Sequence, residues 1–518
     1  MKTKKIIVLA FLAIGLSFSG CKKDFLELSN PNVQTTSTFW QTEDQAILGV
    51  NGIYHALGYD GTFLRFAPAC LDSRDDITRS PSPWDAFSAV AQFNLRVTNY
   101  MPEAMYVAHY DIIKRANAAI ANLPKVAYTT QGMQDRLMGE AKFLRGMTYM
   151  YIVLFFNHVP LIIDAPQSSA DFFAPQVEPS LVWEQIYKDL NEAATLLPAT
   201  YEDANKGRAT KGAALGYLGK AYLFNKDYTK AAQIFKQIID SHVYALMPNY
   251  EDNFTETREN NIESIFEIQF QRMNQPNLNW VGEPPADNDH TTARGITYAP
   301  QPFGWGDMAI NKWIFDEYKI EKTTSGEYDP RLFATVTFDY PGCTLYGKTF
   351  REAWPYTGAD TAKWANMFFC RKYENVNSGR PDEFDWRSGI NERLMRYSDI
   401  LLMYAECQLE LGSNADAAKY IQIVRNRANL PDREAEFAAM PKAQLFDQLT
   451  HERALEFCLE GHRFDDIVRW GWLTDPAKLA MLKAHDAEWN GYIAGKEHMP
   501  IPQIEMDTNP NAIQNPSY

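Results

Sequence analysis

Two stretches of this chain, nearly two hundred residues apart, have the spacing of paired helices, and this limits the fold more than any other feature. Gly219 and Ala231 lie twelve positions apart, and Ala405 and Ala417 repeat that offset. Small residues at these positions let two helices approach closely while bulkier neighbours fill the space beside them. The residues that match the tetratricopeptide template are Leu215, Leu218, Gly219, Tyr222, Ala231 and Phe235, with Ala405, Ala417 and Ile421 in the second stretch. The pattern predicts a mostly α fold, a tetratricopeptide-like helical-repeat scaffold interrupted in sequence, although a chance pattern in unrelated helices stays open.

Two further segments have the pattern of long helices. Apolar residues occupy every side of the second half of the segment from Gln134 to Phe156, which predicts a helix buried almost all round. Another helix is predicted from Ser180 through Leu197, with Ser180 as its N-cap and Pro198 as its stop. Both helices would extend the scaffold.

The segment from Pro248 to Gly389 has a different character. It contains clusters such as VGEPPADND and APQPFGWGD and little sustained helical period, which predicts loops and short strands laid over the scaffold. We therefore divide the mature chain into a helical-repeat region (21–247), a loop-rich insertion (248–389) and a C-terminal helical region with a Pro-rich tail (390–518). Long irregular insertions usually carry function, so ligand contacts are expected there and in the loop from Cys70 to Phe93.

Composition excludes several classes of protein. The 518 residues have a formal net charge of −15 and no long run of Lys and Arg, which argues against a nucleic-acid partner. A hydrophobic fraction of 46% with 22% charged residues is typical of a globular protein with a large core. Most of the 12 Trp, 27 Tyr and 30 Phe are expected in that core, although a carbohydrate-binding surface would use the same side chains.

The amino terminus predicts export. Three lysines among the first five residues precede an apolar run from Ile6 to Leu16, and small residues lead into Cys21. We interpret residues 1–20 as a secretory signal peptide, because the apolar run is too short to span a bilayer. The sequence around Cys21 resembles a bacterial lipobox, so Cys21 is expected to be acylated, although Phe18 departs from the usual pattern. An ordinary secreted protein with an incidental cysteine is the alternative.

The remaining cysteines predict neither a disulfide framework nor a zinc ribbon, because their number is odd and none has CxxC spacing. Cys407 and Cys458 lie in apolar helical patterns and are predicted to be buried thiols. A bridge between Cys343 and Cys370 stays open. The set consists of Cys70, Cys343, Cys370, Cys407 and Cys458.

One literal phosphate-binding motif is present and is rejected on its context. The run GCTLYGKT from Gly342 to Thr349 matches a P-loop, whose backbone amides would cradle phosphates at the start of a helix. Pro341 interrupts the strand before it, and Pro355 forbids a long helix after it. A nucleotide site is therefore not predicted.

No metal, cofactor or catalytic site is predicted either. His451 and Glu452 begin like a zinc-protease HExxH, but Leu455 stands where the second ligand would be. Asp287 and Asp289 form only a fragment of a calcium loop. Carboxylate pairs for glycoside hydrolysis stay open, since such partners meet only in three dimensions.

Several segments together resemble the SusD/RagB family of outer-membrane nutrient-uptake lipoproteins. The resemblance spans the mature chain, with two small departures: Ser398 stands where the family usually has Ala, and the closing residues are NPSY in place of NPGY. The segments that carry it are NERLMRYSDILLMYAECQLELG from Asn391, HERALEFCLEGHRFDDIVRWG from His451, PIPQIEMDTNPNAIQNPSY from Pro500, CKKDFLELSNP from Cys21, FWQTEDQAILGVNGIYHAL from Phe39 and EAKFLRGMTYMYIVLFFNHVPLI from Glu140.

The resemblance implies a surface-exposed protein, lipid-anchored in the outer membrane through Cys21, that binds oligosaccharide or polysaccharide. It further implies delivery of the glycan to a SusC-like TonB-dependent transporter, with no cofactor and no catalysis. In such proteins the helical scaffold faces the transporter and the ligand cleft lies on the other side. A peptide-binding member of the same family is the alternative, and an extracellular glycosidase or a pure tetratricopeptide scaffold is less favoured.

Two regions supply the side chains that sugar recognition needs, namely aromatic faces for the ring and polar groups for the hydroxyls. The first lies around Asp72 to Asp76, although these acids could instead form a salt-bridge knot within the loop. The second holds several Trp and Tyr residues of the insertion, including Trp354 and Trp364. For any single aromatic residue, core packing is the more frequent role. The predicted ligand-binding residues are Arg74, Asp75, Trp84, Asn94, Trp280, Tyr298 and Trp305, of which Arg74, Asp75, Trp84 and Trp305 are the strongest candidates.

Charged residues near the carboxyl end are predicted to be architectural. Spacing allows pairs between Asp465 and Arg469, between Asp466 and Arg469 and between Glu460 and Arg463. These pairs would fix one helix against its neighbours. Four prolines after residue 499 should hold the tail extended as a strap across the fold.

Overall fold

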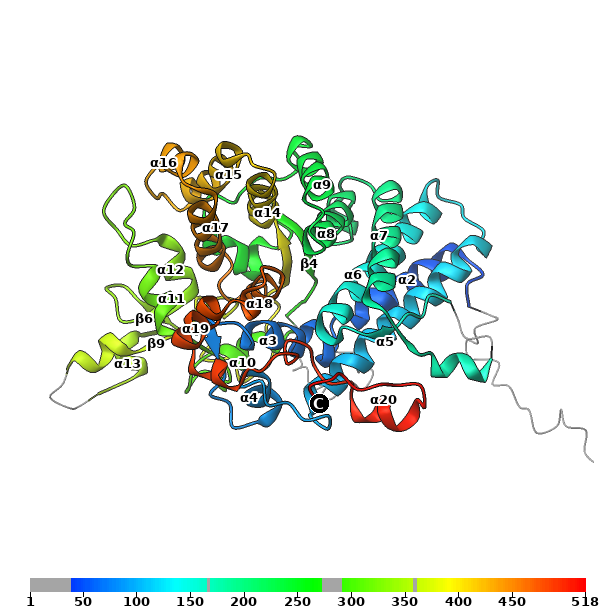
Figure 1. Ribbon diagram of the computed structural model, residues 1–518, viewed down its shortest axis with the longest axis horizontal. Coiled ribbons are helices and arrows are strands. Elements are labelled where there is room, and N and C mark those ends of the chain that lie inside the picture. The colour runs from blue at the N-terminus through cyan, green and yellow to red at the C-terminus, as the bar shows by residue number, and fades with distance from the viewer. Residues whose placement is uncertain (1–38, 165–167, 273–290, 357–360) are drawn as a thin grey trace, which may run out of the picture.

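The computed structural model describes residues 39–164, 168–272, 291–356 and 361–518, and its dominant feature is a row of paired helices (Figure 1). Each helix of the row contacts the next, and α9 is followed in space by α14 although more than 150 residues separate them in sequence. The predicted mostly α helical-repeat scaffold, interrupted in sequence, is confirmed. The row consists of α6 (Met133–Phe156), α7 (Pro179–Leu196), α8 (Lys211–Phe224), α9 (Tyr228–Asp240), α14 (Tyr397–Glu410) and α15 (Asn414–Arg427).

The α8–α9 hairpin packs as its spacing predicts. A Cβ atom placed on Gly219 would lie 2.5 Å from the Phe235 ring, so only glycine permits this approach of the two helices. Ala231 and Phe235 are fully buried. Tyr222 stacks on Tyr187 of α7 at a centroid distance of 4.6 Å, which joins the hairpin to the preceding helix.

The predicted bounds of α6 are correct to one residue, whereas the predicted start of α7 is wrong. Ser180 was expected to cap α7, but the helix begins at Pro179, and Glu178 takes the extended cap conformation. Proline is favoured at the first helical position because its fixed φ already suits the helix and its missing N–H is not needed there.

A second group of helices packs on the amino-terminal side of the row. Of these, α2 lies against α5 and α6, and a capping box between Thr42 and Gln45 fixes its start. The group consists of α2 (Glu43–Ala56), α3 (Phe66–Ser73), α4 (Asp85–Ala91) and α5 (Tyr100–Asn122).

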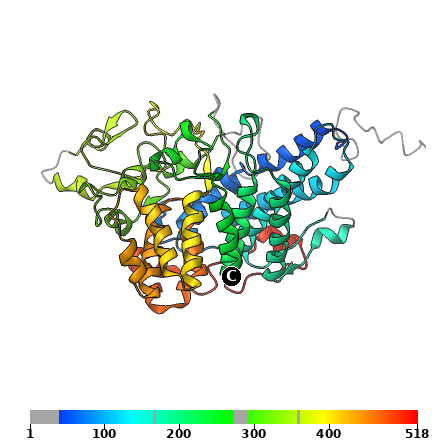
Figure 2. The ribbon, with the colours of Figure 1, turned by 90° about the horizontal axis from the view of Figure 1, so that it is seen from above.

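The loop-rich segment covers one side of the helices, as Figure 2 shows from above. All its described strands belong to two-stranded antiparallel sheets: β6–β9 and β7–β8 lie within the segment, whereas β5 pairs with β1 and β4 pairs with β10 outside it. A further sheet, β2–β3, lies wholly outside the segment. The predicted short strands are thus confirmed, and short helices alternate with them. The elements are β1 (Thr78–Arg79), β2 (Val159–Pro160), β3 (Gln176–Val177), β4 (Ser264–Ile268), α10 (Arg294–Tyr298), β5 (Ala309–Ile310), α11 (Lys312–Glu317), α12 (Pro330–Thr335), β6 (Val336–Phe338), β7 (Thr344–Leu345), β8 (Lys348–Thr349), α13 (Phe350–Ala353), β9 (Phe368–Cys370) and β10 (Glu392–Arg396).

The P-loop-like run does not form a phosphate cradle. Its residues make the tight β7–β8 hairpin, and the helix that follows, α13, is only four residues long. Five cysteines, among them Cys343 and Cys370, are free and buried, and the predicted burial of Cys407 and Cys458 is confirmed.

The last part of the chain closes the fold. After α16 (Glu434–Ala439) and α17 (Lys442–Glu456) come α18 (Arg463–Arg469), α19 (Pro476–His485) and α20 (Gln503–Thr508). The tail then returns to the amino-terminal half, where Met499 N donates to Phe155 O at 2.7 Å and Asn515 Nδ2 donates to Phe156 O at 3.0 Å. These carbonyls end α6, where no further helical N–H can reach them. The predicted strap is confirmed by these contacts, which cap a helix more than 340 residues away, but the tail is not extended throughout, because α20 forms between Pro502 and Pro510.

A buried network of charged side chains, here called the ion-pair core, ties α14, α15 and α17 to the loop-rich segment. Arg396 contacts Glu263 at 2.5 Å, Glu456 at 3.0 Å and Glu460 at 2.7 Å. Lys372 lies 2.9 Å from Glu460. Arg396 and its neighbouring cations hold the pKa values of Glu456 and Glu460 below their usual range despite burial. The core comprises Glu263, Arg331, Lys372, Arg396, Arg427, Glu452, Glu456 and Glu460.

The predicted local pairs of α18 are partly replaced by longer-range pairs. Asp466 and Arg469 lie 2.6 Å apart as expected. Glu460 pairs with Arg396 and Lys372 in place of Arg463, which instead contacts Asp76 at 2.8 Å. The helix is therefore fixed against its neighbours by these charges, as predicted, but mostly through partners far away in sequence.

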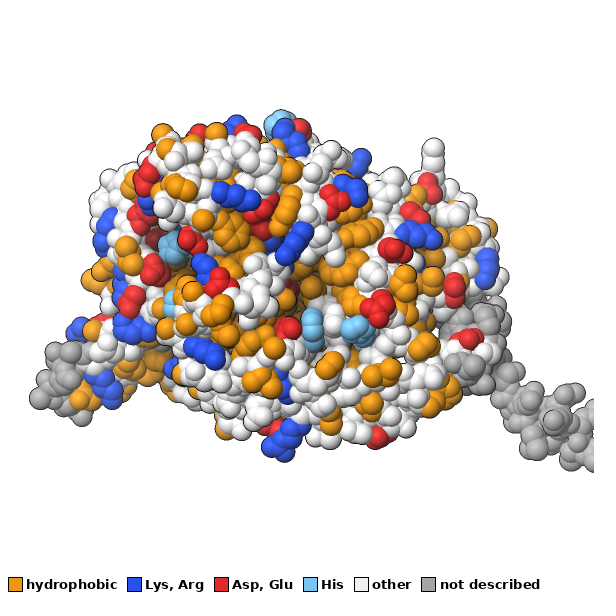
Figure 3. Space-filling view, viewed as in Figure 1, with side chains coloured by type: hydrophobic (Ala, Val, Ile, Leu, Met, Phe, Trp, Pro, Cys, Tyr) orange, Lys and Arg blue, Asp and Glu red, His pale blue; other side chains and the backbone are white. Residues whose placement is uncertain are grey.

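The outer surface mixes side-chain types. Basic and acidic side chains are interspersed with hydrophobic ones over the face seen in Figure 3. In the described part of the chain we find no helix with both the length and the apolar character that a bilayer span requires.

Candidate functional site

Two half-buried tryptophans from different parts of the loop-rich segment meet at the surface. The rings of Trp305 and Trp386 lie 4.8 Å apart at an interplanar angle of 77°. Both pack over the buried side chains of Leu64, Ala293 and Ile296. We call the two rings and these three supporting residues the tryptophan platform. Half-exposed rings on an apolar floor offer a fixed surface to a flat ligand face.

The position of Trp305 follows from the chain around α10. Trp305 N donates to Ile296 O at 2.8 Å, so the loop after α10 folds back on the helix and fixes the backbone that carries the Trp305 ring. A Cβ atom on Gly304 would lie 2.7 Å from the carbonyl oxygens of Ile296 and Ala299. Glycine is therefore required for the loop to return this closely to α10.

Glu383 holds the second tryptophan against the first loop. Its backbone N donates to Phe303 O at 2.8 Å, and its carbonyl accepts from Trp386 N at 3.1 Å. Its carboxylate accepts from Asn375 N at 2.8 Å and from Tyr346 Oη at 3.0 Å. A Cβ atom on Gly295 would lie 2.8 Å from Glu383 Oε2, so glycine in α10 makes room for the acid. The backbone of Glu383 thus joins the Trp386 turn to the loop that carries Trp305, and its buried side chain fixes that backbone against Asn375 and Tyr346.

A hydrogen-bonded acid connects the platform to the loop that carries Trp84. Ser82 Oγ donates to Asp307 Oδ1 at 2.6 Å, and Ser80 Oγ donates to Asp307 O at 2.8 Å. Burial raises the pKa of Asp307, which the Ser82 hydroxyl partly offsets. The structure therefore brings the regions of Trp84 and Trp305 together, although 221 positions separate the two residues.

Trp84 is half-buried in an aromatic cluster of its own. Its ring stacks on Tyr100 at 6.2 Å and meets Phe87 edge-on at 5.3 Å. The Arg65 guanidinium lies 5.3 Å from the Trp84 ring, and Arg65 Nε donates to Asp60 Oδ1 at 2.8 Å. Because Arg65 follows Leu64 of the platform floor, the cluster adjoins the platform.

Arg74 and Asp75 are placed inside the protein. Arg74 is 1% exposed; its Nη1 donates to Glu497 O at 3.0 Å, and its guanidinium lies 4.1 Å from the Phe464 ring. Asp75 is 2% exposed and accepts from the backbone N of Ile77 and of Thr78, both at 2.8 Å. Burial and the neighbouring acids raise the pKa of Asp75 well above its usual value. These contacts are structural. Ligand binding by Arg74 or Asp75 stays a prediction, and the burial of both side chains does not favour it.

The other acids of this loop form the salt-bridge knot that was the alternative interpretation. Asp72 lies 3.0 Å from Arg294 and accepts from Tyr298 Oη at 2.7 Å, so Tyr298 is buried beneath the surface. Asp76 contacts Arg463 at 2.8 Å and His485 at 2.6 Å. The knot joins α3 to segments more than 200 residues away.

The remaining predicted contacts are dispersed. Asn94 is exposed, just after α4. Trp354 and Trp364 belong to a separate aromatic group, where Trp364 Nε1 donates to Trp354 O at 3.0 Å. Trp280 and Cys21 lie outside the described residues. Trp386, Glu383 and Asp307 were missed in the sequence, and the available signal was a lone tryptophan in the charged loop DEFDWRSG.

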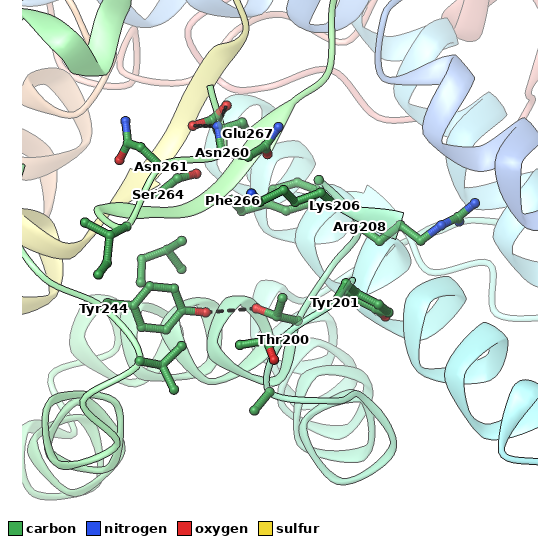
Figure 4. A pocket seen from close by; sticks show the side chains of 16 residues that line it. Thr200, Tyr201, Lys206, Arg208, Tyr244, Asn260, Asn261, Ser264, Phe266 and Glu267 are labelled. Atoms are coloured by element: carbon green, nitrogen blue, oxygen red, sulfur yellow. Dashed lines mark hydrogen bonds between the residues drawn. The ribbon is translucent and has the colours of Figure 1, made fainter. Parts of the chain in front are cut away.

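A pocket elsewhere offers less to a ligand. It has a volume of about 320 Å³ and lies between β4 and the α7–α8 connection (Figure 4). Two of its labelled polar side chains are bonded within the protein: Asn260 pairs with Gln269 in both directions, and Tyr244 Oη lies 3.0 Å from Thr210 Oγ1. Within the described residues, no group of three or more His, Cys, Asp and Glu side chains could hold a metal ion.

Comparison with known proteins gives one family. Residues 262–518 match the model described as the SusD family, and residues 24–223 match a model described as starch-binding associating with outer membrane. The chain belongs to the SusD family. A SusD-like protein, P25 of Formosa agariphila, is 24% identical over 99% of this chain and 98% of its own length.

Solved structures show the same fold. A SusD superfamily protein from Bacteroides vulgatus has a TM-score of 0.79 at 29% identity, covering 93% of this chain and all of that one. A laminarin binding SusD-like protein has a TM-score of 0.74 at 25% identity, covering 92% of this chain and all of that one. The family resemblance predicted from the sequence is confirmed.

Proposed function

We propose that this SusD-family protein binds an oligosaccharide at its tryptophan platform. The observation that carries the proposal is the fixed pair of half-exposed rings, Trp305 and Trp386, 4.8 Å apart on a buried apolar floor. Aromatic faces pack against the C–H surface of a pyranose ring, and nearby polar groups bind its hydroxyls. Asp307 and the Ser82 hydroxyl supply such groups beside the platform.

We propose further that the protein delivers the glycan to a SusC-like TonB-dependent transporter, while an acyl chain on Cys21 holds it on the outer membrane. Support comes from the lipobox-like sequence before Cys21 and from the family match to proteins associating with the outer membrane. No catalytic role is proposed, since a binding platform performs this task without bond cleavage. A β-glucan is a first ligand to test, because one structural relative is a laminarin binding protein.

The test compares matched tryptophan variants of the full chain, purified in a detergent without sugar head groups. Binding of laminarin oligosaccharides and of a wider glycan panel is measured by calorimetry. Trp305→Ala and Trp386→Ala should each weaken binding about tenfold or more, as expected for buried aromatic anchors. Trp183→Ala, which removes a half-buried tryptophan of α7 far from the platform, should leave binding unchanged.

Three results would overturn the proposal. Equal affinity in the platform variants and the Trp183 variant would remove the platform as the site. Stabilisation by peptide digests and by none of the glycans would favour the peptide-binding alternative, because ligand binding to the native state raises the melting temperature. Release of new reducing ends from a polysaccharide would instead identify a glycosidase.

A further inference from the structure

A second cleft lies beyond the segment that carries Trp386. It opens between the turns at Tyr250–Phe254 and Glu256–Arg258 and the stretch 371–378, and its volume is about 200 Å³. Exposed Thr257 and Asn377 are at its mouth, and the buried side chains lie deeper. We call this the 254–374 cleft. Its lining includes Phe254, Thr257, Arg371, Glu374, Asn377 and Ile390.

Two buried polar side chains of the 254–374 cleft each have an atom that could form a further hydrogen bond. Glu374 is 6% exposed; its Oε2 accepts from Tyr346 Oη at 3.2 Å, whereas its Oε1 has no hydrogen-bond partner in the described structure. Arg371 is 7% exposed; its Nη1 donates to Thr344 O at 3.2 Å, and its Nε is likewise without a partner there. A buried polar group left unpaired costs about 1–3 kcal/mol, so a site that keeps two of them is suited to a polar ligand.

The charges around the cleft favour a neutral ligand. Burial and the nearby Glu383 raise the pKa of Glu374 well above its usual value, which favours the protonated form, and a protonated carboxyl group can both donate and accept. The Arg371 guanidinium lies 3.8 Å from the Glu251 carboxylate, which compensates its charge. Glu256 adds a second carboxylate, which accepts from Gly389 N at 2.8 Å. An anionic ligand would meet these two carboxylates, and a cationic one would meet Arg371.

The rest of the lining is apolar. Phe254 and Ile390 are 4% and 3% exposed, and Val376 lies beside them. One aromatic and two aliphatic walls opposite a carboxylic acid and a guanidinium match the two sides of a sugar ring, whose C–H faces are apolar and whose edges carry hydroxyls.

We propose that the 254–374 cleft binds one neutral sugar ring, as a second glycan site separate from the tryptophan platform. Its volume is below the roughly 300 Å³ at which pockets for larger ligands begin, so it fits a single ring and not an oligosaccharide. The ring is expected to hydrogen-bond the carboxyl group of Glu374 and the guanidinium of Arg371, which line the cleft, and to pack on Phe254. The inference rests on the proposed function only for the class of ligand.

The two sites are joined by a short rigid segment. Trp386 lies at one end of it, and Ile390 lines the cleft at the other. Between them, Ser388 Oγ accepts from Asn375 Nδ2 at 2.9 Å, and Tyr346 Oη reaches both Glu383 and Glu374. A ring bound in the cleft would therefore contact the same hydrogen-bond network that holds Trp386.

The test uses monosaccharides, which are too small to span both sites. Saturation-transfer NMR and calorimetry are run on the full chain in a detergent without sugar head groups, with glucose, galactose, mannose and xylose, and with glucuronate as an anionic match for glucose. At least one neutral sugar should bind, and glucuronate should bind about tenfold more weakly or not at all. Thr257→Trp, at the exposed mouth, should abolish binding, whereas Thr474→Trp in a distant exposed turn should not.

Glu374→Met separates binding from folding. It removes a buried acid whose Oε1 has no partner, and Tyr346 Oη keeps its bond to Glu383, so the melting temperature should stay the same or rise. Sugar binding should nevertheless fall at least tenfold. A melting temperature that falls together with unchanged sugar binding would assign Glu374 a purely structural role and overturn the proposal.

The platform variants distinguish this inference from the proposed function. Monosaccharide binding that survives Trp305→Ala but is lost in Thr257→Trp supports the cleft. Binding lost in Trp305→Ala and kept in Thr257→Trp overturns the cleft and leaves the platform intact. Absence of binding by every monosaccharide, with oligosaccharides still bound, also overturns the cleft alone.

Discussion

The ion-pair core and the tryptophan platform use their side chains in opposite ways. In the core, Arg396 is 1% exposed and contacts three carboxylates that are themselves buried. In the platform, Trp305 and Trp386 keep part of their surface exposed over an apolar floor. Charged residues, which normally face water, are inside, and large aromatic residues, which normally fill cores, are at the surface.

The difference separates residues that stabilise the fold, in the ion-pair core, from residues that face solvent and could contact a ligand, in the tryptophan platform. Arg396 and Glu460 lie within the segments that identify the family, and their partners are all protein groups. The two tryptophans of the platform lie in loops attached to that core, where a ring can change without disturbing buried charges. Sequence segments that identify a family therefore need not contain its ligand contacts.

The largest effect is expected from breaking the core. Arg396→Ala leaves Glu263, Glu456 and Glu460 without their shared partner, and an uncompensated buried charge is strongly unfavourable. The free energy of unfolding should fall by about 3–5 kcal/mol, measured by urea denaturation. A loss below about 1 kcal/mol would mean that Arg427 and Lys372 compensate the acids, and the core would not be the support described here.

The next largest effect is expected from Glu383, a buried acid beside the tryptophan platform. Glu383→Ala keeps the backbone bonds to Phe303 and Trp386 but removes the carboxylate that fixes this turn against Asn375 and Tyr346, so both stability and glycan affinity should change. We expect a loss of about 1–3 kcal/mol in the free energy of unfolding, the usual cost of unpairing buried groups. Affinity for the oligosaccharide bound by the wild type should fall about tenfold. Glu383→Gln, which keeps the shape and an acceptor oxygen, should retain most of both.

If affinity is unchanged in Glu383→Ala while stability falls, the platform does not depend on this link. Calorimetry on the same preparations used for unfolding separates the two outcomes.

A smaller effect, of opposite sign, is expected from one acid of α18. Asp465 is buried and forms no ion pair within the described residues, and burial raises its pKa to about 6. The native state therefore holds a proton more tightly than the unfolded chain, whose Asp has a pKa near 3.9. Stability contributed by this group is present at low pH and is lost as pH rises from about 4 through about 6.

Asp465→Asn removes that dependence. At pH 8 the variant should be more stable than the wild type by about 1–3 kcal/mol, whereas at pH 4 the two should match within error. Denaturation at both pH values measures the difference. A variant less stable at pH 8 would show that Asp465 is ionised and held by a partner.

The smallest effect is expected from an exposed pair of the same chemistry. Arg433 and Glu436 lie 2.6 Å apart at the surface. Arg433→Ala should change the free energy of unfolding by less than about 1 kcal/mol, because solvent screens exposed pairs. A loss as large as that of Arg396→Ala would show that burial is not what distinguishes the core.

Sequence alone predicted the elements whose pattern is local. The bounds of α6 were correct because its apolar residues repeat at helical spacing along one continuous segment. The close approach at Gly219 was predicted for the same reason. The start of α7 was wrong because two signals, Pro179 and Ser180, are adjacent and the proline prevails.

The candidate site was predicted only in part. Trp84 and Trp305 are brought to adjoining surfaces, as expected for the strongest candidates. Arg74 and Asp75 resemble ligand-binding residues in sequence, but Arg74 bonds Glu497, more than 400 positions away, and Asp75 accepts from the backbone of its own loop. Nothing local distinguishes an acid that faces solvent from one that is paired inside. Trp386 was missed because its partner ring is likewise distant.

The strap formed by the tail has a consequence for biosynthesis. The last carbonyls of α6 are bonded by Met499 N and by Asn515 Nδ2, so that helix cannot acquire its final capping until the closing residues have been synthesised. An emerging chain lacks these donors for nearly its whole length, and the amino-terminal half stays short of its finished packing during that time. The export that we propose for this chain would gain from such a delay, because a polypeptide crosses a membrane more readily before it has folded completely.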